Sequence, residues 1–427
     1  MGYGPAVLRF PPRFLFGTAT SSHQVEGGLT NNDWYDWAGM PGRIRDGSRA
    51  GAACDWWAGR AEDDLRLSAQ LGHHAHRCSL EWSRLEPEPG RFDDAAFARY
   101  REIFTAARAA GLELFVTVNH FTLPRWAAAR GSWLHRGLAE RFAGLCGRVA
   151  SELGDLVTAF ATLNEPSVVA FLGYAGHLWP PGMRDPAAAP VALANMLRAH
   201  AGGYRAMKAV APDAQVGIVL NAPYFDPVGS GLDRVLAGVQ DWAFTEVVLR
   251  GLRSGFLWPP LSVLPSRVPG LRGAVDWLGL NYYGRFGVRF DPSAPEMFFG
   301  QHVQEPSVRT EWTDWGQPWP DGLTAQLHRF GKLGVPVYVT ENGIYDNTDT
   351  QRPAFLRRHI RAVHRAWTEG VDVRGYFHWS LVDNFEWAEG YATHFGLVEV
   401  DFETGARTPR GSAEVYRQIC ADRAIEG

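Results

Sequence analysis

Two glutamates at the ends of two apolar runs are the residues of this chain that are best suited to catalysis. Glu165 stands in the run TLNEP (residues 162–166), and Glu341 stands in VTENG (residues 339–343). A carboxylate is costly to bury, so two of them at the exits of buried strands indicate chemistry rather than packing. Cleavage of a glycosidic bond is the reaction that most needs two carboxyl groups facing one substrate.

The residues that follow each glutamate predict where its strand ends. Pro166 favours an extended conformation for Glu165 and has no N–H group with which to continue a strand. Asn342 and Gly343 favour a tight turn directly after Glu341. Both carboxyl groups are therefore expected at the ends of their strands.

Short apolar runs bounded by turn-forming residues recur along the chain and predict eight strands. Several of these runs are almost continuously apolar, as expected for strands that are covered on both faces. The predicted strands are Phe14–Thr20, Ala75–Trp82, Leu114–Phe121, Thr158–Glu165, Gln215–Asn221, Val275–Tyr283, Pro336–Glu341 and Val373–Leu381.

Helical stretches alternate with these strands, and glycines stand where the carboxyl-terminal helix caps belong, at Gly72, Gly111, Gly154, Gly334 and Gly370. The predicted helices are Glu62–Leu71, Phe97–Ala110, Leu138–Leu153, Leu193–Val210, Leu232–Arg250, Gly322–Leu333 and Phe355–Thr368. This alternation predicts a parallel (β/α)8 barrel, a fold whose active site lies at the carboxyl-terminal ends of the strands.

Polar residues gather at the predicted carboxyl-terminal end of nearly every strand. Any one of them is more simply explained as a cap or a turn residue, but their number favours a shared site. They are Gln24, Glu26, Arg77, Glu81, Asn119, His120, Asn164, Glu165, Asn221, Asn281, Tyr283, Glu341, Trp379 and Glu386.

Composition and charge exclude several classes of partner. The chain has 427 residues, a formal net charge of −4 and no basic stripe of the kind that binds nucleic acid or anionic lipid. No apolar run approaches the roughly 18 residues that a membrane-spanning helix needs. Because no linker or break in composition divides the sequence, we expect one domain over residues 1–427.

The cysteines and the amino terminus bear on the location of the protein. The four cysteines, Cys54, Cys78, Cys146 and Cys420, show no CxxC spacing, which argues against a zinc site and a disulfide framework. Residues 1–12 lack the basic and apolar segments of an export signal. These features predict a cytoplasmic protein with reduced thiols and with neither metal nor cofactor.

Seven motifs, in order along the chain, resemble those of glycoside hydrolase family 1, the family of β-glucosidases and related retaining β-glycosidases. A lone NEP motif would be a weak signal, but the ordered set is highly specific and runs nearly from end to end. The motifs are FLFGTATSSHQVEG (14–27), RCSLEWSR (77–84), HFTLP (120–124), LNEP (163–166), GLNYY (279–283), VTENG (339–343) and GYFHWSLVDNFEW (375–387).

The resemblance implies a role for each matching residue. Glu165 would be the acid/base and Glu341 the nucleophile. Arg77 and Tyr283 would flank the nucleophile, and Asn164 would hold the substrate 2-hydroxyl. The other residues implied are Gln24, His120, Glu386 and Trp387 for the 3-, 4- and 6-hydroxyls, Trp379 as the floor of the sugar site, Phe395 beside it and Asn221 toward the leaving group.

The implied reaction is hydrolysis of terminal β-D-glycosides with retention, through a covalent glycosyl-enzyme intermediate, and retention requires carboxyl groups about 5–5.5 Å apart. Arg77 and Tyr283 should keep Glu341 ionised, whereas negative charge and burial should raise the pKa of Glu165. Small neutral β-glycosides or oligosaccharides are the expected substrates, with hydrolysis and transglycosylation both open. The residues do not rank a glucoside above a galactoside or a fucoside.

The departures from the family's usual wording lie toward the leaving-group side. Phe121 stands where many members have tryptophan, and His394 replaces the usual arginine before Phe395. No Ser-x-Lys-x-x-Tyr pattern follows Trp379, and Glu386 stands in that region instead. A carboxylate there would repel phosphate, so 6-phosphoglycosides are not expected.

Two rival classes of protein and one metal hypothesis are less favoured. A catalytically inactive sugar-binding barrel usually lacks one carboxylate, and both are present here. An aldolase needs a lysine at a strand end, but the only lysines, Lys208 and Lys332, lie in helical segments. His73, His74 and His76 could suggest a metal site, yet they lie on the amino-terminal side of the second strand, where a cap or a surface cluster is expected.

Four further polar residues near strand ends are assigned structural roles. Glu26 and Glu81 are expected to pair with neighbouring arginines rather than to catalyse. Asp383 and Asn384 are expected to turn the loop after the last strand.

Overall fold

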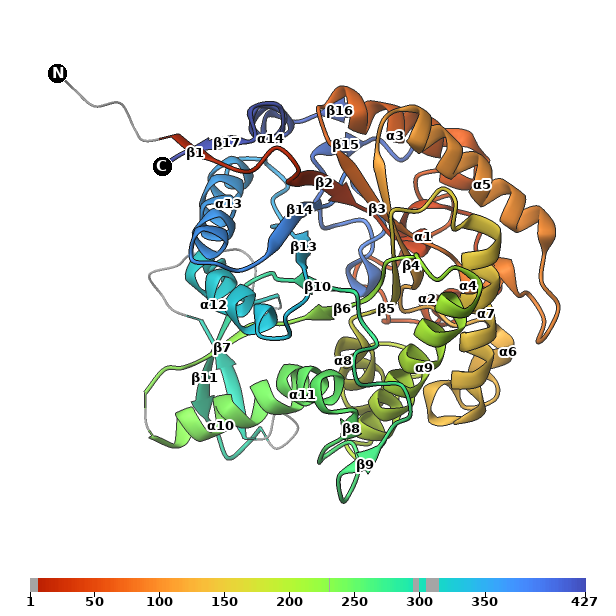
Figure 1. Cartoon of the computed structure of the whole chain (residues 1–427), viewed down its shortest axis with the longest axis vertical. Coiled ribbons are helices and arrows are strands. Elements are labelled where there is room, and N and C mark those ends of the chain that lie inside the picture. Colours follow the sequence, from red (N-terminus) through yellow and green to blue (C-terminus); the bar gives the residue numbers. More distant parts are fainter. Residues whose placement is uncertain (1–6, 230, 295–298, 305–314) are drawn as a thin grey trace.

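Eight parallel strands close into a barrel in the computed structural model, which describes residues 7–229, 231–294, 299–304 and 315–427 (Figure 1). The strands follow one another around the barrel in chain order, and the last pairs with the first. The predicted (β/α)8 barrel is therefore confirmed. Its strands are β2 (Leu15–Ala19), β3 (Ala75–Ser79), β4 (Glu113–Asn119), β5 (Ala159–Asn164), β6 (Val216–Asn221), β10 (Trp277–Asn281), β13 (Val337–Asn342) and β14 (Val373–Trp379).

The longer helices surround the barrel (Figure 1). Each predicted helix is present with ends shifted by a few residues, and the stretch predicted as one helix over Leu232–Arg250 is helical throughout, with a π-helical turn that separates α10 from α11. α10 covers a small outer sheet, and after a wider turn at Trp242–Glu246 the chain continues as α11. The helices are α3 (Ala61–Gln70), α5 (Asp94–Ala109), α7 (Gly137–Leu153), α9 (Ala188–Val210), α10 (Gly231–Asp241), α11 (Val247–Ser254), α12 (Pro320–Gly331), α13 (Arg352–Thr368) and α14 (Gly411–Asp422).

Glycines end several of these helices as predicted. Gly72, Gly111, Gly334 and Gly370 have positive φ angles of 77°, 87°, 74° and 99°, which suit a left-handed helix cap. Gly154 caps α7 differently, because its φ is −62°. A side chain there would meet the backbone oxygen of Ala150 at 2.4 Å, so close packing rather than a left-handed turn requires this glycine.

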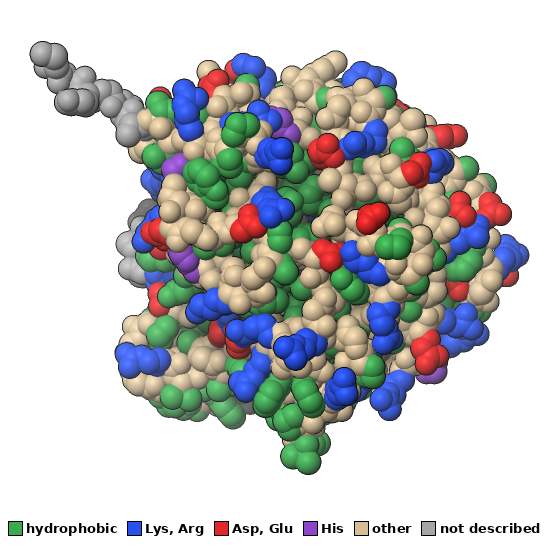
Figure 2. All heavy atoms as spheres, in the orientation of Figure 1, with side chains coloured by type: hydrophobic (Ala, Val, Ile, Leu, Met, Phe, Trp, Pro, Cys, Tyr) green, Lys and Arg blue, Asp and Glu red, His purple; other side chains and the backbone are tan. Residues whose placement is uncertain are grey.

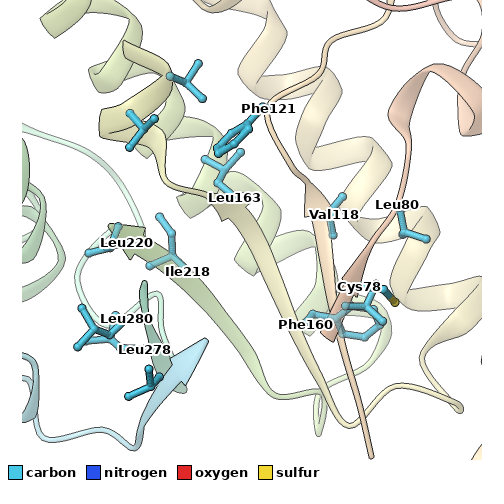
Figure 3. Packing of buried hydrophobic residues seen from close by; sticks show 14 of the residues in the cluster. Cys78, Leu80, Val118, Phe121, Phe160, Leu163, Ile218, Leu220, Leu278 and Leu280 are labelled. Atoms are coloured by element: carbon cyan, nitrogen blue, oxygen red, sulfur yellow. The ribbon is translucent and has the colours of Figure 1, made fainter. Parts of the chain in front are cut away.

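The outward faces of the strands pack against the helices. Figure 3 shows this layer, in which Cys78, Val118, Phe160, Ile218 and Leu280 come from five different strands. All five side chains are buried. Burying a side chain of this kind contributes roughly 1.5–3 kcal/mol, so this double-sided cover explains why the strand sequences are almost continuously apolar.

Inside the barrel, an apolar layer fills the end nearer the amino termini of the strands. It consists of Ala75, Phe115, Ala159, Trp277 and Phe377, all at most 4% exposed. The Phe115 ring lies 4.9 Å from that of Phe377 and 5.7 Å from that of Trp277, centroid to centroid. Because this layer is closed by packed rings, only the carboxyl-terminal end of the barrel can hold a site.

Three strands shift register near their carboxyl ends. In β5 the shift lies between Ala161 and Asn164, and in β10 it lies between Leu280 and Asn281. In β13 it lies between Val339 and Asn342. A β-bulge breaks the strict alternation of side chains and turns the following residues toward a different face.

Several shorter elements lie outside the eight strands of the barrel. β7, β11 and β12 form a small sheet beside α10, two hairpins project from the barrel, and β1 joins β17 near the chain ends (Figure 1). On the face shown in Figure 2, basic and acidic side chains are interspersed. These elements are β1 (Val7–Arg9), β7 (Tyr224–Pro227), β8 (Phe256–Leu257), β9 (Ser266–Arg267), β11 (Arg285–Phe290), β12 (Gly300–Val303), β15 (Val398–Val400), β16 (Arg407–Pro409), β17 (Ala424–Glu426), α1 (Ser22–Val25), α2 (Asp33–Ala38), α4 (Trp82–Leu85), α6 (Arg125–Ala128) and α8 (Pro166–Val169).

Candidate active site

A polar layer lies above the apolar layer, at the carboxyl-terminal end of the barrel. It consists of Arg77, Asn164, Glu165, Asn281 and Glu341, each at most 5% exposed. Arg77 comes from the same strand as Ala75, two residues further on, so both side chains point inward. Side chains from β3, β5, β10 and β13 thus meet in one hydrogen-bonded group.

Glu341 lies between a guanidinium and a phenol. Nη1 of Arg77 donates to its Oε1, and Oη of Tyr283 donates to its Oε2 at 2.7 Å. Both partners favour the ionised carboxyl group, one by its charge and one by its hydrogen bond. Burial, together with the nearby carboxyl groups, raises the pKa of Tyr283 well above its usual range, so the phenol keeps its proton and remains a donor.

The strand does not end in a tight turn after Glu341, contrary to the prediction from Asn342 and Gly343. β13 continues through Asn342, whose Nδ2 donates to the backbone oxygen of Tyr282 at 2.6 Å. A side chain at position 343 would meet the backbone oxygen of Trp379 at 2.0 Å. Glycine is needed here because two backbones approach closely.

Glu165 has a left-handed backbone, with φ 45° and ψ 57°, so the extended conformation predicted from Pro166 is wrong. Pro166 instead begins the short helix α8, a position that suits proline because the first helical N–H has no partner. A non-glycine residue in this region costs roughly 1–3 kcal/mol and persists only where the surroundings enforce it. Phe121 and Trp387, also near the site, have positive φ angles of 75° and 50°.

Two amides surround the carboxyl group of Glu165. Its Oε1 accepts from Nδ2 of Asn281 at 2.6 Å and from Nδ2 of Asn221 at 3.1 Å. Burial raises the pKa of Glu165 most, and the negative charge of Glu341 raises it further. The two carboxyl groups therefore stand in opposite environments, one beside a cation and one in a buried, amide-lined position.

Asn164 links the two carboxyl groups to the sugar-binding candidates. Its Oδ1 accepts from Nη2 of Arg77 at 2.7 Å, and its Nδ2 lies 3.2 Å from Nε2 of His120. The His120 ring stacks near two indoles, with centroids 6.1 Å from Trp379 and 5.9 Å from Trp387. These rings form an aromatic wall beside the carboxyl groups.

A second polar group lies at the far end of this wall. Nε2 of Gln24 donates to Oδ1 of Asn384 at 2.8 Å and to Oε2 of Glu386 at 3.1 Å. Oε1 of Gln24 accepts from Oγ of Ser21 at 2.6 Å, which fixes the orientation of the amide. Burial raises the pKa of Glu386 to about 8, and the charge of Glu341 contributes to that rise.

Phe395 lies next to Tyr283, the residue that donates to Glu341. Its ring centroid is 6.2 Å from that of Tyr283 and 5.8 Å from that of Trp315. All the residues that the sequence assigned to the site therefore come from the carboxyl-terminal ends of the strands or from the loops that follow them. Asn221, which donates to Glu165, comes from the end of β6, the strand next to β5 in the barrel.

Sequence reasoning assigned no specific role in the site to four contributors. Asn281 stood among the polar strand ends, but nothing assigned it to Glu165. Thr340, Ser21 and Asn384 were not assigned to the site, and each fixes the orientation of an amide side chain in it. Their position inside the motifs at residues 14–27, 279–283, 339–343 and 375–387 was the only available signal.

Some structural expectations for nearby residues were wrong. His73 and His76 do not form a surface cluster, because both are buried. Oγ of Ser68 lies 2.9 Å from Nδ1 of His73, and the hydroxyls of Thr18 and Thr20 contact the two ring nitrogens of His76. Burial lowers the pKa of each histidine to about 3, so both are neutral. In the part of the chain that the structure describes, no three histidine, cysteine or acidic side chains are grouped to hold a metal ion.

Of the two acidic residues expected to pair with arginines, one does. Glu26 accepts from Nε of Arg84 at 2.8 Å. The carboxyl group of Glu81 instead accepts from hydroxyl and amide donors, among them Thr122 and Asn32. The buried Asp383 does not simply turn a loop, because it pairs with Arg410 at 2.7 Å.

The sequence profile of glycosyl hydrolase family 1 matches residues 7–424 of this chain. β-Glucosidase A of Thermotoga maritima is 33% identical over 98% of this chain and 99% of its own length. A β-galactosidase of Pyrococcus woesei is 30% identical over 97% of this chain and 98% of its own. The solved structure of a β-glycosidase from Pyrococcus horikoshii superposes with a TM-score of 0.91 at 37% identity, covering 99% of this chain and 97% of that one.

Proposed function

Since this chain belongs to glycosyl hydrolase family 1, a family of retaining glycosidases, we propose that it works through Glu165 as acid/base and Glu341 as nucleophile. The chain is a β-glycosidase that hydrolyses terminal β-D-glycosides through a covalent glycosyl-enzyme intermediate. The observation that carries the assignment of roles is the contrast between the two carboxyl groups. One is held by a guanidinium and a phenol, whereas burial and a neighbouring charge favour a proton on the other.

In the first step, a carboxylate oxygen of Glu341 attacks the anomeric carbon and forms a glycosyl ester. The bond from that carbon to the leaving oxygen breaks, and Glu165 gives its proton to that oxygen. Arg77 and Tyr283 fix the position of the Glu341 carboxylate, so the surrounding groups need little reorganisation as charge moves. The leaving group departs as a neutral alcohol.

In the second step, Glu165 acts as a base. Formation of the ester removes the negative charge of Glu341, and with it one of the two causes that raise the pKa of Glu165. Glu165 is then ionised and takes a proton from water, whose oxygen attacks the anomeric carbon and releases Glu341. Two inversions at one carbon give net retention.

The substrate-binding roles follow from the chemistry of each side chain. Asn164 offers its amide to the 2-hydroxyl, next to the anomeric carbon. The more distant 3-, 4- and 6-hydroxyls are left to the polar atoms of Gln24, His120, Glu386 and Trp387. Trp379 presents an apolar face to the C–H groups of a sugar ring. Phe395 lines the pocket beside it, and Asn221 lies toward the leaving group.

Small neutral β-glycosides or oligosaccharides are the substrates that this site suits. Glu386 is buried beside Gln24, with no cation among the partners described for it, so a phosphate on the sugar would find no counter-charge there. The names of the relatives include both a β-glucosidase and a β-galactosidase. We propose that the protein cleaves β-glucosides. Galactosides and fucosides are the sugars to compare with them.

Two coarser properties of the protein are part of this proposal. Residues 1–427 would act as one domain, built on the single closed barrel of the described chain. A cytoplasmic location is supported by four buried cysteines without a disulfide among them. Within the described residues, no helix is both long and apolar enough to cross a membrane.

A panel of 4-nitrophenyl β-glycosides, observed by proton NMR, tests the proposal. We expect hydrolysis of the β-glucoside, no cleavage of the α-anomer or of a 6-phosphoglucoside, and a β-configured sugar as the first product. A first product of α-configuration would contradict a double displacement. Comparison of the gluco, galacto and fuco substrates by kcat/KM then ranks the sugars.

A further inference from the structure

The hydrogen bonds around Glu165 treat its two oxygen atoms differently. Oε1 accepts from the amide nitrogen of Asn281 at 2.6 Å and from that of Asn221 at 3.1 Å. No hydrogen bond of the described residues involves Oε2. Asn281 and Glu165 are completely or almost completely buried, at 0% and 5% exposed, so water does not average this difference away.

The direction of the shorter bond is set by a residue that can only donate. Arg77 carries donors and no acceptor, so the atom of Asn164 that faces its Nη2 at 2.7 Å must be the amide oxygen. That oxygen lies 3.1 Å from an amide end of Asn281, which must then be the nitrogen. The same nitrogen faces Oε1 of Glu165, so it is a donor there as well.

Thr340 completes the arrangement from the other end of the Asn281 amide. Its hydroxyl donates to Oδ1 of Asn281 at 2.7 Å, so both the nitrogen and the oxygen of this amide are hydrogen-bonded in one orientation. Thr340 directly precedes Glu341, and Asn281 is the register partner of Glu341 across the β10–β13 pair. The backbone that positions the nucleophile thereby also orients the donor to the acid.

We propose that Asn281 is a positioning residue that keeps the catalytic proton of Glu165 on Oε2, the oxygen that faces the leaving group. This inference rests on the proposed role of Glu165 as the acid. A proton on Oε1 would point at two N–H groups, and a buried donor facing donors is unfavourable. Oε2 is the oxygen without such a donor, so it can carry the proton.

The same donors assist when the proton leaves. As the Oε2–H bond breaks, its electron pair stays on Glu165, and the proton forms a bond to the glycosidic oxygen as that oxygen leaves the anomeric carbon. The new carboxylate shares its charge with Oε1, where both amides stabilise it. In agreement with this, the hydrogen bonds of Asn281 and Asn221 lower the pKa of Glu165 against the opposing effect of burial.

Replacement of Asn281 should therefore weaken proton donation more than any other step. For Asn281→Ala, we expect kcat/KM to fall by about 10- to 100-fold on alkyl or 4-methoxyphenyl β-glucosides, which need a proton on the leaving oxygen. On 2,4-dinitrophenyl β-glucoside, whose leaving group needs no proton, we expect a change of less than about 3-fold. The basic limb of the pH profile should move to higher pH, because a donor to the ionised form is lost.

Asn195→Ala is a matched control for the loss of a buried amide. Asn195 is 1% exposed in α9, and its Nδ2 donates to the backbone oxygen of Trp133 at 2.8 Å, away from the carboxyl groups. It should lower the melting temperature without changing the ratio of the rates on the two substrates. Equal losses on both substrates for Asn281→Ala, with an unmoved basic limb, would overturn the inference and leave Asn281 a purely structural residue.

The failure of the inference can be told apart from the failure of the proposed function. Glu165→Ala must show the same split between poor and activated leaving groups, in larger measure, if Glu165 is the acid. Should Glu165→Ala show no split, the assignment of the acid fails. Should it show the split while Asn281→Ala does not, only the positioning role fails.

Neutron diffraction of the deuterated wild-type protein observes the proton itself. Crystals at about pH 5 should show a deuteron on Oε2 of Glu165 and two deuterons on the nitrogen of Asn281, one of them directed at Oε1. A deuteron on Oε1, or an Asn281 amide with its oxygen toward Glu165, would overturn the inference. This measurement does not depend on any variant folding.

Discussion

The inside of the barrel is built from one set of strands, yet its two ends have opposite chemistry. The apolar layer around Phe115 is closed by ring contacts, whereas the polar layer two residues further along the strands holds Arg77 and the two glutamates. Burial of aromatic rings stabilises the folded state, whereas burial of carboxyl groups destabilises it unless they are paired. Stability is therefore concentrated at one end of these strands, and reactivity at the other.

The hydrogen-bond networks on the two faces of β3 differ in the same way. On the outward face, His76 lies between two threonine hydroxyls and is satisfied in its neutral form. On the inward face, Arg77 is divided between Glu341 and Asn164, and each of those contacts a further group of the site. The first network fixes a fold, and the second positions the groups that react.

The largest effect is expected from Glu341→Gly. Loss of the nucleophile should lower kcat by at least about 10⁴-fold, because no covalent intermediate can form. Azide fits the space left by the side chain and should attack the anomeric carbon directly, so the product expected with an activated glucoside is the α-glucosyl azide. Detection of turnover close to that of the wild type without azide would mean that another group is the nucleophile.

Glu165→Ala should have the next largest effect. Loss of the acid should cost about 10²- to 10⁴-fold on poor leaving groups, and much less on the first step of activated ones. Azide then intercepts the glycosyl ester on Glu341, so the expected product is the β-glucosyl azide. The α-azide from this variant would show that the two glutamates have been assigned the wrong way round.

Phe115→Ala, in the apolar layer, should reverse the pattern. The cavity should lower the free energy of unfolding by about 3–5 kcal/mol. Below the unfolding transition, kcat per folded molecule should stay within about 3-fold of the wild type, because the ring contacts described for Phe115 join it to Trp277 and Phe377 of the apolar layer. A large loss of kcat without a loss of stability, measured by calorimetry, would show that the two layers are coupled.

The smallest effect is expected from the pH dependence of stability at Glu386. In the folded protein, burial raises its pKa from 4.5 to about 8. The folded state thus holds a proton that the unfolded state loses first, so its contribution to stability is complete below pH 4.5 and falls as the pH rises to about 8. Glu386→Gln should match the wild type in melting temperature near pH 4.5 and exceed it by a few degrees near pH 8.

An unchanged difference in melting temperature between the wild type and Glu386→Gln across that pH range would contradict a buried, neutral Glu386. The histidines give a trend of opposite sign. Burial lowers the pKa values of His73 and His76 from 6.5 to about 3, so their contribution is complete above pH 6.5 and is lost as the pH falls toward 3. With these three groups together, maximum stability is expected near pH 6.5, where the contribution of the histidines is complete and that of Glu386 is not yet fully lost.

The order of strands and helices could be predicted from the sequence, because continuous apolar runs and capping glycines report burial on both faces. The site could be predicted in outline for a related reason. Parallel strands deliver their carboxyl ends to one place, so polar residues such as Arg77 and Asn164 had to meet there. The π-helical turn at Trp242–Glu246 could not be predicted, since apolar spacing does not reveal that α10 and α11 have different packing partners.

The orientation of individual side chains could not be predicted either. Rules about proline and turns describe average peptides, and they gave an extended Glu165 and a turn at Gly343. The structure has a left-handed residue and a close backbone approach at these two places. The bulges in β5, β10 and β13 arise from closure of the barrel, a long-range condition that no local pattern records. Asn281 directly follows one of these bulges, so its orientation toward Glu165 was not visible in the sequence.

Trapping of the intermediate tests the assignment of Glu341 most directly. A 2-deoxy-2-fluoro β-glucoside with a dinitrophenolate leaving group should form the ester and hydrolyse slowly, because fluorine destabilises the oxocarbenium-like transition states. Mass spectrometry should then find one fluoroglucosyl group per chain, on the peptide that contains Glu341 and on that side chain. A label on any other residue, or complete hydrolysis without a detectable adduct, would contradict the mechanism.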